Sequence, residues 1–206
     1  CTGSNYAASM GENYIRNVAN KIAVLEKDIN GFAGYNTLTD KLKGDIAEFW
    51  HSDTFNVKGA AQGSGFQTTV NRSHDFGSAD ITSNFGMKYG LKYYSDGQKS
   101  ANAQSVSFFE RFSKFKSESG RTDLSFLDYL KEKGIDDESV MYDPIYSGQV
   151  RIIPADQLKE AVEYLKWKIA KESLTRPEQV YRYQETLNSL ATKIESSDGV
   201  SSIELI

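Results

Sequence analysis

The chain has 206 residues, of which 39% are hydrophobic and 25% charged, and its formal net charge is −4. These values are typical of a globular protein with one domain, or one domain and an added lobe. The single cysteine, Cys1, excludes an internal disulfide and a cysteine-ligated zinc site, and two histidines are too few for a histidine-rich metal site. An acidic balance argues against a protein that coats nucleic acid, but not against an enzyme that touches a few phosphates beside a metal ion.

The first residues, CTGSNYAASMG, leave two interpretations of cellular location open. In one, Cys1 is the acylated residue of a lipid-anchored surface protein. In the other, which we favour, Cys1 has no such role and the chain is cytoplasmic. A chain with a single cysteine fits a reducing compartment. No apolar run approaches the roughly 20 residues that span a bilayer, so we expect no membrane contact unless Cys1 is lipidated.

Two amphipathic helices are predicted first, over residues 10–29 and 38–51, with Thr37 or Thr39 as the cap of the second. Their apolar positions recur at helical spacing: Ile15, Val18, Ile22, Leu25 and Ile29, then Leu42, Ile46, Phe49 and Trp50. Residues 52–77 are rich in Gly, Ser, Asn and Thr, and they predict a short strand (GFQTTV) and a loop (NRSHDFGS) with little helix.

Two adjacent strands follow, ADITSNF and MKYGLKYY, with a turn at Asn84 to Gly86. A helix over residues 99–117 comes next, then the short helix LSFLDYLKEKG and a loop-like insert, GIDDESVMYDPIYSG. The segment QVRIIP predicts a strand that ends at Pro154, and two helices and a short strand in the tail complete the chain.

This order predicts an α/β fold with a central mixed sheet of about four strands flanked by helices. We divide the chain into an N-terminal helical extension (1–36), an α/β core (37–154) and a C-terminal helical cover (155–206).

Three side chains in the core have the chemistry of a metal-assisted hydrolase: Glu48 on the second helix, Asp80 at the start of a strand and Lys92 on the next strand. Two converging carboxylates can hold Mg²⁺, which prefers oxygen ligands. A neighbouring lysine can orient or deprotonate the attacking water and offset charge on the phosphate. Each residue also has a structural interpretation: a solvated helix charge for Glu48, a turn cap for Asp80 and a strand lysine for Lys92. Asp45 is an alternative to Glu48.

The order helix, three strands, helix, strand over residues 38–154, with Glu48, Asp80 and Lys92 in these places, resembles the PD-(D/E)xK nuclease superfamily, whose fold is restriction-endonuclease-like. The resemblance implies a Mg²⁺- or Mn²⁺-dependent endonuclease with Glu48 and Asp80 as metal ligands and Lys92 as the catalytic lysine. It also implies that Gln104, on the following helix, faces the site. The chain departs from the family pattern in two places, since SAD replaces PD and Gly90 stands where the family carries its second acid.

Candidate substrate-binding residues are Arg72, His74, Lys88 and Lys99. The expected partner is nucleic acid, DNA before RNA, and restriction-type enzymes often act as homodimers. The alternative is a non-enzymatic interaction or assembly protein of a phage or mobile element that has kept a nuclease-like scaffold, which the glycine at position 90 favours.

Overall fold

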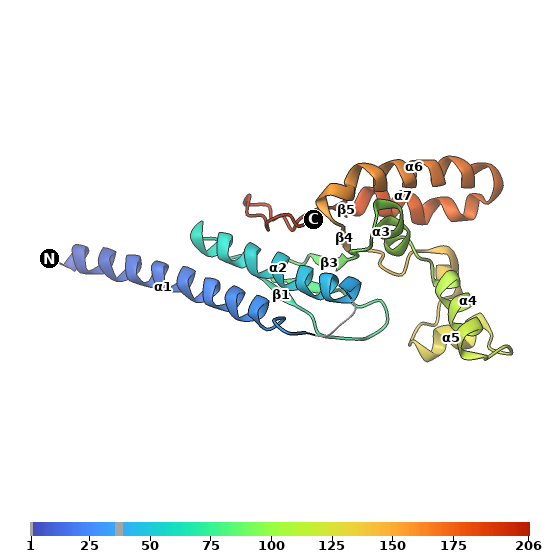
Figure 1. Ribbon diagram of the computed structural model, residues 1–206, viewed down its shortest axis with the longest axis horizontal. Helices are drawn as coiled ribbons and strands as arrows, with labels where there is room; N and C mark the ends of the chain where they lie inside the picture. Colours follow the sequence, from blue (N-terminus) through green and yellow to red (C-terminus); the bar gives the residue numbers. More distant parts are fainter. Residues whose placement is uncertain (1, 36–38) are drawn as a thin grey trace.

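The computed structural model describes residues 2–35 and 39–206, so the expectations that concern Cys1 and Thr37 lie outside the described residues. The described residues form seven α-helices and a mixed five-stranded sheet, which makes the chain an α/β protein (Figure 1). We expected a sheet of about four strands. The structure has one more, because the two-residue strand β5 (Leu190–Ala191) pairs with the edge of the sheet.

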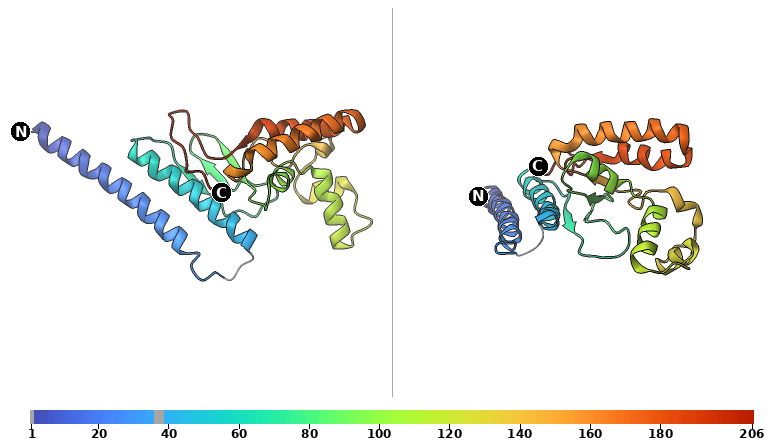
Figure 2. Two further views of the ribbon diagram at one scale, coloured as in Figure 1. Left: turned by 45° about the horizontal axis from the view of Figure 1, so that its top comes forward. Right: turned by 45° about the vertical axis from the view of Figure 1, so that its right-hand side comes forward.

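Helices α1 (Thr2–Asn30) and α2 (Thr39–Ala61) lie side by side in all views and run in opposite directions (Figures 1 and 2). Helix α2 continues ten residues beyond the predicted end at residue 51. The polar residues there do not form a loop because Phe55 is fully buried against the sheet. The side chain of Asn56 also bonds the backbone N–H and C=O of Thr68, at 2.8 Å each, on the first strand.

The sheet has the order β1 (Thr68–Val70), β2 (Ile81–Ser83), β3 (Lys88–Leu91), β4 (Val150–Ile152) and β5. The first three strands are antiparallel, and β3, β4 and β5 run parallel to one another. The predicted turn between β2 and β3 is present, and Gly86 adopts a φ of 80° that favours glycine there.

The predicted helix over residues 99–117 is wrong as a single element, because it is divided into α3 (Gly97–Gln104) and α4 (Phe108–Ser119). Ser107 ends the continuity: its hydroxyl accepts a hydrogen bond from the N–H of Glu110 and caps α4. Helix α5 (Phe126–Glu132) follows, and the loop-like insert contains a short 3₁₀ turn at Glu138–Tyr142. Helices α4 and α5 lie together, apart from α1 and α2 (Figure 1).

Helices α6 (Leu158–Thr175) and α7 (Val180–Ser189) form a hairpin, as predicted for residues 155–206. This C-terminal region is more than a cover, because it supplies β5 and because Ile194 and Val200 are fully buried in the main core. The predicted strand in the tail is reduced to a single bridge between Glu195 and Ser201.

Helices cover both faces of the sheet. Tyr89 and Leu91 of β3 belong to the core cluster that includes Phe55 of α2. The intervening residue, Gly90, faces α3, where the amide of Gln104 donates to the carbonyl oxygens of Gly90 and Ile152. None of the helices formed by residues 2–35 and 39–206 is long and apolar enough to cross a membrane.

Candidate active site

Asp80 is fixed to β3 through both its backbone and its side chain. Its N–H donates to the carbonyl oxygen of Tyr89 at 2.9 Å, and its Oδ2 atom accepts a 2.7 Å hydrogen bond from the N–H of Leu91. These two bonds hold the Asp80 carboxylate at the N-terminal end of β2. Only the second bond uses a carboxylate oxygen, so the other oxygen is not occupied by it.

Glu48 lies on α2 near this carboxylate. Burial, and after it the charges of Asp80 and Asp45, raise the pKa of Glu48 to about 8 against the lowering effect of Arg72 and Lys92. Because the interaction between charges falls with distance, groups that shift this pKa lie near the carboxyl group. The structure therefore brings Glu48, Asp80 and Lys92 into one electrostatic neighbourhood, with Asp45 and Arg72 at its edge.

Lys92 follows β3 and is held by a 3.0 Å hydrogen bond from its N–H to the carbonyl oxygen of Ile152. Its Nζ atom lies 4.6 Å from the centre of the Tyr146 ring, within cation–π range. Burial lowers the pKa of the Lys92 ammonium, but Tyr146 and Asp80 outweigh burial, so the pKa lies above its usual value. Lys92 therefore keeps its charge, which favours electrostatic stabilisation over the predicted deprotonation of water.

Arg72 reaches the site from the end of β1. The N–H of the preceding residue, Asn71, donates to the carbonyl oxygen of Asp80 at 2.7 Å, which brings this end of β1 beside Asp80. The Arg72 guanidinium lies 5.4 Å from the centre of the Phe49 ring. An exposed arginine at this position can meet a phosphate next to the two carboxylates.

Gly90, the residue at the place of the missing acid, is crossed by the side chain of Gln149. A Cβ at position 90 would lie 2.7 Å from Gln149 Oε1 and 3.9 Å from Gln104 Oε1. Both glutamines are buried, and the amide nitrogen of each donates to backbone carbonyl oxygens. Neither oxygen has a hydrogen-bond partner among the described residues.

The other predicted substrate-binding residues are less clearly placed at the site. His74 is exposed in the loop between β1 and β2, and Lys88 is exposed at the start of β3, two residues before Gly90. Lys99 lies in the first turn of α3, 3.7 Å from Asp96, and it lines a cleft that also contains Lys92. Gln104 points toward β3 as expected, but its amide nitrogen ties β3 to β4.

Sequence reasoning missed Tyr146, in the segment that we expected to be a loop-like insert, and Gln149, the first residue of the predicted strand QVRIIP. Gly90 itself could have indicated the approach of Gln149, because a glycine inside a strand often marks the close approach of another group.

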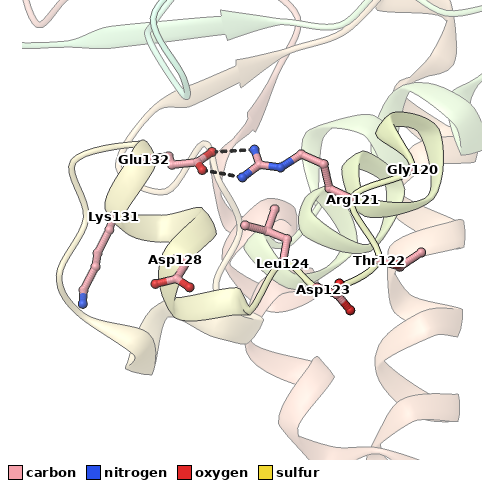
Figure 3. Close-up of a pocket in the computed structure, with 8 residues that line it drawn as sticks. All are labelled: Gly120, Arg121, Thr122, Asp123, Leu124, Asp128, Lys131 and Glu132. Carbon is pink, nitrogen blue, oxygen red and sulfur yellow. Dashed lines mark hydrogen bonds and ion pairs between the residues drawn. The ribbon is translucent and has the colours of Figure 1, made fainter.

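Lys92 lines two clefts, one of about 570 Å³ beside α3 and α4 and one of about 330 Å³ beside α2. A separate cleft of about 660 Å³ lies between the end of α4 and α5. There the side chains of Arg121 and Glu132 point toward each other and form a paired ion bridge at 2.7 and 3.0 Å (Figure 3). Since its lining contains three carboxylates and two cations, this cleft is a weaker candidate for binding an anionic substrate.

Glu48 and Asp80 offer carboxylate oxygens, the ligand type that a divalent cation such as Mg²⁺ prefers. Within residues 2–35 and 39–206, no group of three or more His, Cys, Asp or Glu side chains forms a ready-made metal cluster. Mg²⁺ does not require one, because it keeps several waters and binds through one or two carboxylates together with substrate phosphates. Two mutually repelling carboxylates, one with a raised pKa, are stabilised by such a cation.

Comparison with known proteins adds no relative: no family model, no curated protein and no solved structure matches this chain.

Proposed function

We propose that the protein is a metal-dependent nuclease that hydrolyses phosphodiester bonds in DNA, with RNA as the second substrate to test. The observation that carries this proposal is geometric: Asp80, before β2, and Lys92, after β3, lie at the same end of two paired antiparallel strands, and the Asp80 carboxylate accepts a hydrogen bond from the N–H of Leu91, the neighbour of Lys92. The charge of Asp80 also raises the pKa of Glu48 on α2. A helix acid, a strand acid and a lysine that stays charged are thus gathered at one end of the sheet. The order α2, β1, β2, β3, α3, β4 also agrees with the restriction-endonuclease-like fold that we infer for the core.

In this proposal Glu48 and Asp80 hold Mg²⁺ or Mn²⁺. The bound cation supplies Lewis-acid activation of water and of the phosphate. The Lys92 ammonium, held between Tyr146 and Asp80, offsets negative charge that develops on the phosphate oxygens. Arg72 binds a neighbouring phosphate and fixes the scissile bond relative to the carboxylates.

The decisive experiment is cleavage of supercoiled plasmid and of single-stranded DNA and RNA, with Mg²⁺ or with EDTA. We expect Mg²⁺-dependent nicking that Asp80→Asn abolishes and Lys92→Met lowers by about 10²–10³-fold, the size of effect when one preorganised charge is lost. Asp75→Asn, an exposed carboxylate in the preceding loop, is the matched control. Thermal melting verifies that each variant is folded.

Mg²⁺-dependent cleavage that survives both Asp80→Asn and Lys92→Met would show that the activity belongs to another site or a contaminant, and it would overturn the proposal. Absence of cleavage and of Mn²⁺ binding by the unmodified protein would also overturn it.

The second candidate function is that of a non-enzymatic interaction or assembly protein. The specific observation in its favour is that Gln149 occupies the space of the acid that the family places at position 90. A protein that binds nucleic acid or a protein partner but neither binds Mn²⁺ nor cleaves DNA would support this alternative.

A further inference from the structure

A cleft of about 570 Å³ opens directly from Lys92 and runs between α3 and α4. Its remaining lining side chains are Tyr94, Lys99, Asn102, Ala103, Val106, Glu110, Arg111, Lys114 and Tyr146. Helix α4 lies between α3 and β4 in the chain, so this cleft joins the candidate active site to the second of the two helices into which the predicted helix over residues 99–117 divides. A substrate bound at Lys92 would extend into it.

The cleft is strongly cationic although the whole chain has a net charge of −4. Its lining contains four cations and one carboxylate, Glu110. The Glu110 carboxylate forms an ion pair with Arg182, which donates two 2.7 Å hydrogen bonds to it. Arg182 is itself buried, with 2% of its surface exposed. Because Arg182 neutralises Glu110, the positive charges of the cleft remain to attract an anion.

The cations can exchange their present contacts for phosphates. Lys99 and Lys114 make exposed ion pairs with Asp96 and Glu118 at 3.7 and 3.9 Å, and pairs of this kind contribute little. The guanidinium of Arg111 lies 3.5 Å from the Tyr146 hydroxyl, at the limit of a hydrogen bond. A polyanion can therefore bind here without breaking a strong internal interaction.

An exposed aromatic ring stands beside these cations. The three tyrosines in and after β3 differ in exposure. Tyr89 and Tyr93 are buried in the core, whereas Tyr94 is 46% exposed and lines the cleft. Aromatic rings next to a cationic groove are the usual means of binding single-stranded nucleic acid, because any base can stack on them. A cleft in the size range of small-ligand sites, about 300–1,000 Å³, takes a short stretch of one strand and not a double helix.

We propose that this cleft binds a single strand of nucleic acid, with Arg111 and Lys114 on backbone phosphates, Lys99 on the phosphate nearest α3, and a base on Tyr94. The strand leads to Lys92 and hence to the proposed metal site. That connection rests on the proposed nuclease function, whereas binding of the strand does not.

The test is fluorescence anisotropy with a labelled single-stranded oligothymidylate in EDTA, where binding is measured without hydrolysis. We compare the unmodified protein with Arg111→Gln/Lys114→Gln and with the control Lys116→Gln/Arg121→Gln, which removes two charges from the same region outside the cleft. Lys116 lies over Phe112 and Arg121 pairs with Glu132, and neither lines the cleft. Thermal melting establishes that both double variants fold.

We expect the Arg111/Lys114 variant to bind at least about ten-fold more weakly, and its slope of log affinity against log salt to fall by about 1.4, or about 0.7 for each lost phosphate contact. The control variant retains the slope of the unmodified protein. A duplex of the same length binds more weakly than the single strand.

Three results would overturn the inference: unchanged affinity in the Arg111/Lys114 variant, an equal loss in the control, or duplex binding as tight as single-strand binding. These results are separate from the nuclease test. Binding through the cleft without any cleavage or Mn²⁺ binding supports the inference and overturns the nuclease. Cleavage combined with single-strand binding that the Arg111→Gln/Lys114→Gln substitutions leave unchanged overturns the inference but not the nuclease.

Discussion

Gln149 lies across β3 at Gly90, with its Oε1 atom 2.7 Å from the position that a Cβ at residue 90 would take. Its Nε2 atom donates a 2.8 Å hydrogen bond to the carbonyl oxygen of Gly77, which holds the far end of the side chain in place. The backbone of Gly90 does not have a positive φ. Space, and not backbone conformation, therefore requires glycine here.

The first prediction concerns this pair. Gly90→Asp should destabilise the protein, because the new side chain displaces Gln149 and breaks its bond to Gly77. Gln149→Ala should remove the obstacle, so that Gly90→Asp costs much less in its presence. We expect a coupling free energy of about 0.5–3 kcal/mol in a double-mutant cycle measured by urea unfolding, within the range for residues in contact. Purely additive effects would show that Gln149 is not what excludes a side chain at position 90.

The double variant also tests whether position 90 can contribute to metal binding. If the site uses the position that the family assigns to its second acid, Gly90→Asp/Gln149→Ala should bind Mn²⁺ more tightly than the unmodified protein. Calorimetric titration measures this directly, and Gln149→Ala alone is its matched control. Weaker or unchanged metal binding would show that position 90 does not face the cation.

The sequence was sufficient to predict the two adjacent strands that Asp80 precedes and Lys92 follows, because strand periodicity and a short turn act over few residues. It was not sufficient for Tyr146 or Gln149, which lie about 55 residues further along the chain, in the loop-like segment and at the first residue of the strand that follows it. Contacts of this kind depend on how a loop returns to the sheet, and local patterns do not encode that path.

Two element boundaries failed for physical reasons of the same type. Residues 52–61 have a loop-like composition, yet they continue α2 because Phe55 and Asn56 gain contacts with the sheet. Residues 99–117 have continuous helical periodicity, yet Ser107 caps a new helix in their middle. In both places a tertiary contact or a cap outweighs local propensity.

The second prediction uses Glu48, whose pKa is raised to about 8 by burial and by the charges of Asp80 and Asp45. Between its ordinary value and pH 8, the unfolded chain releases this proton while the folded protein retains it, so the carboxyl group lowers stability as pH rises. Glu48→Gln should therefore raise the melting temperature by a few degrees at pH 8.5 and change it little at pH 4.5. The same substitution should abolish cleavage. The exposed Glu12→Gln is the control, and an equal stabilisation of both variants would contradict the assignment.

The third prediction concerns metal binding. A divalent cation at Glu48 and Asp80 must displace the proton that Glu48 holds near neutral pH. Calorimetric titration with Mn²⁺ at pH 7, in two buffers of different ionisation enthalpy, should report release of close to one proton per bound ion. The release should disappear at pH 9.5, where Glu48 is already ionised, and in Glu48→Gln. Binding without proton release at pH 7 would place the cation away from Glu48.

The fourth prediction concerns His51, which links three parts of the fold. This fully buried residue of α2 lies 2.8 Å from both the Ser202 hydroxyl in the tail and the Tyr93 hydroxyl after β3. Burial lowers the pKa of His51 to about 4, so the imidazole is neutral in the folded protein at neutral pH.

As pH falls from 6.5 toward 4, the unfolded chain takes up a proton at His51 before the folded protein does, and stability is lost. The loss approaches roughly 3 kcal/mol near pH 4, at 1.36 kcal/mol per pKa unit. Glu48 and Asp53, whose pKa values are raised, change stability in the opposite direction, so the test is the difference between the unmodified protein and His51→Gln. We expect His51→Gln to be less stable at pH 7 and to lose its disadvantage at pH 4.5 in urea unfolding. A difference that does not vary with pH would mean that His51 titrates normally, and that its contacts with Ser202 and Tyr93 do not hold it in the neutral form.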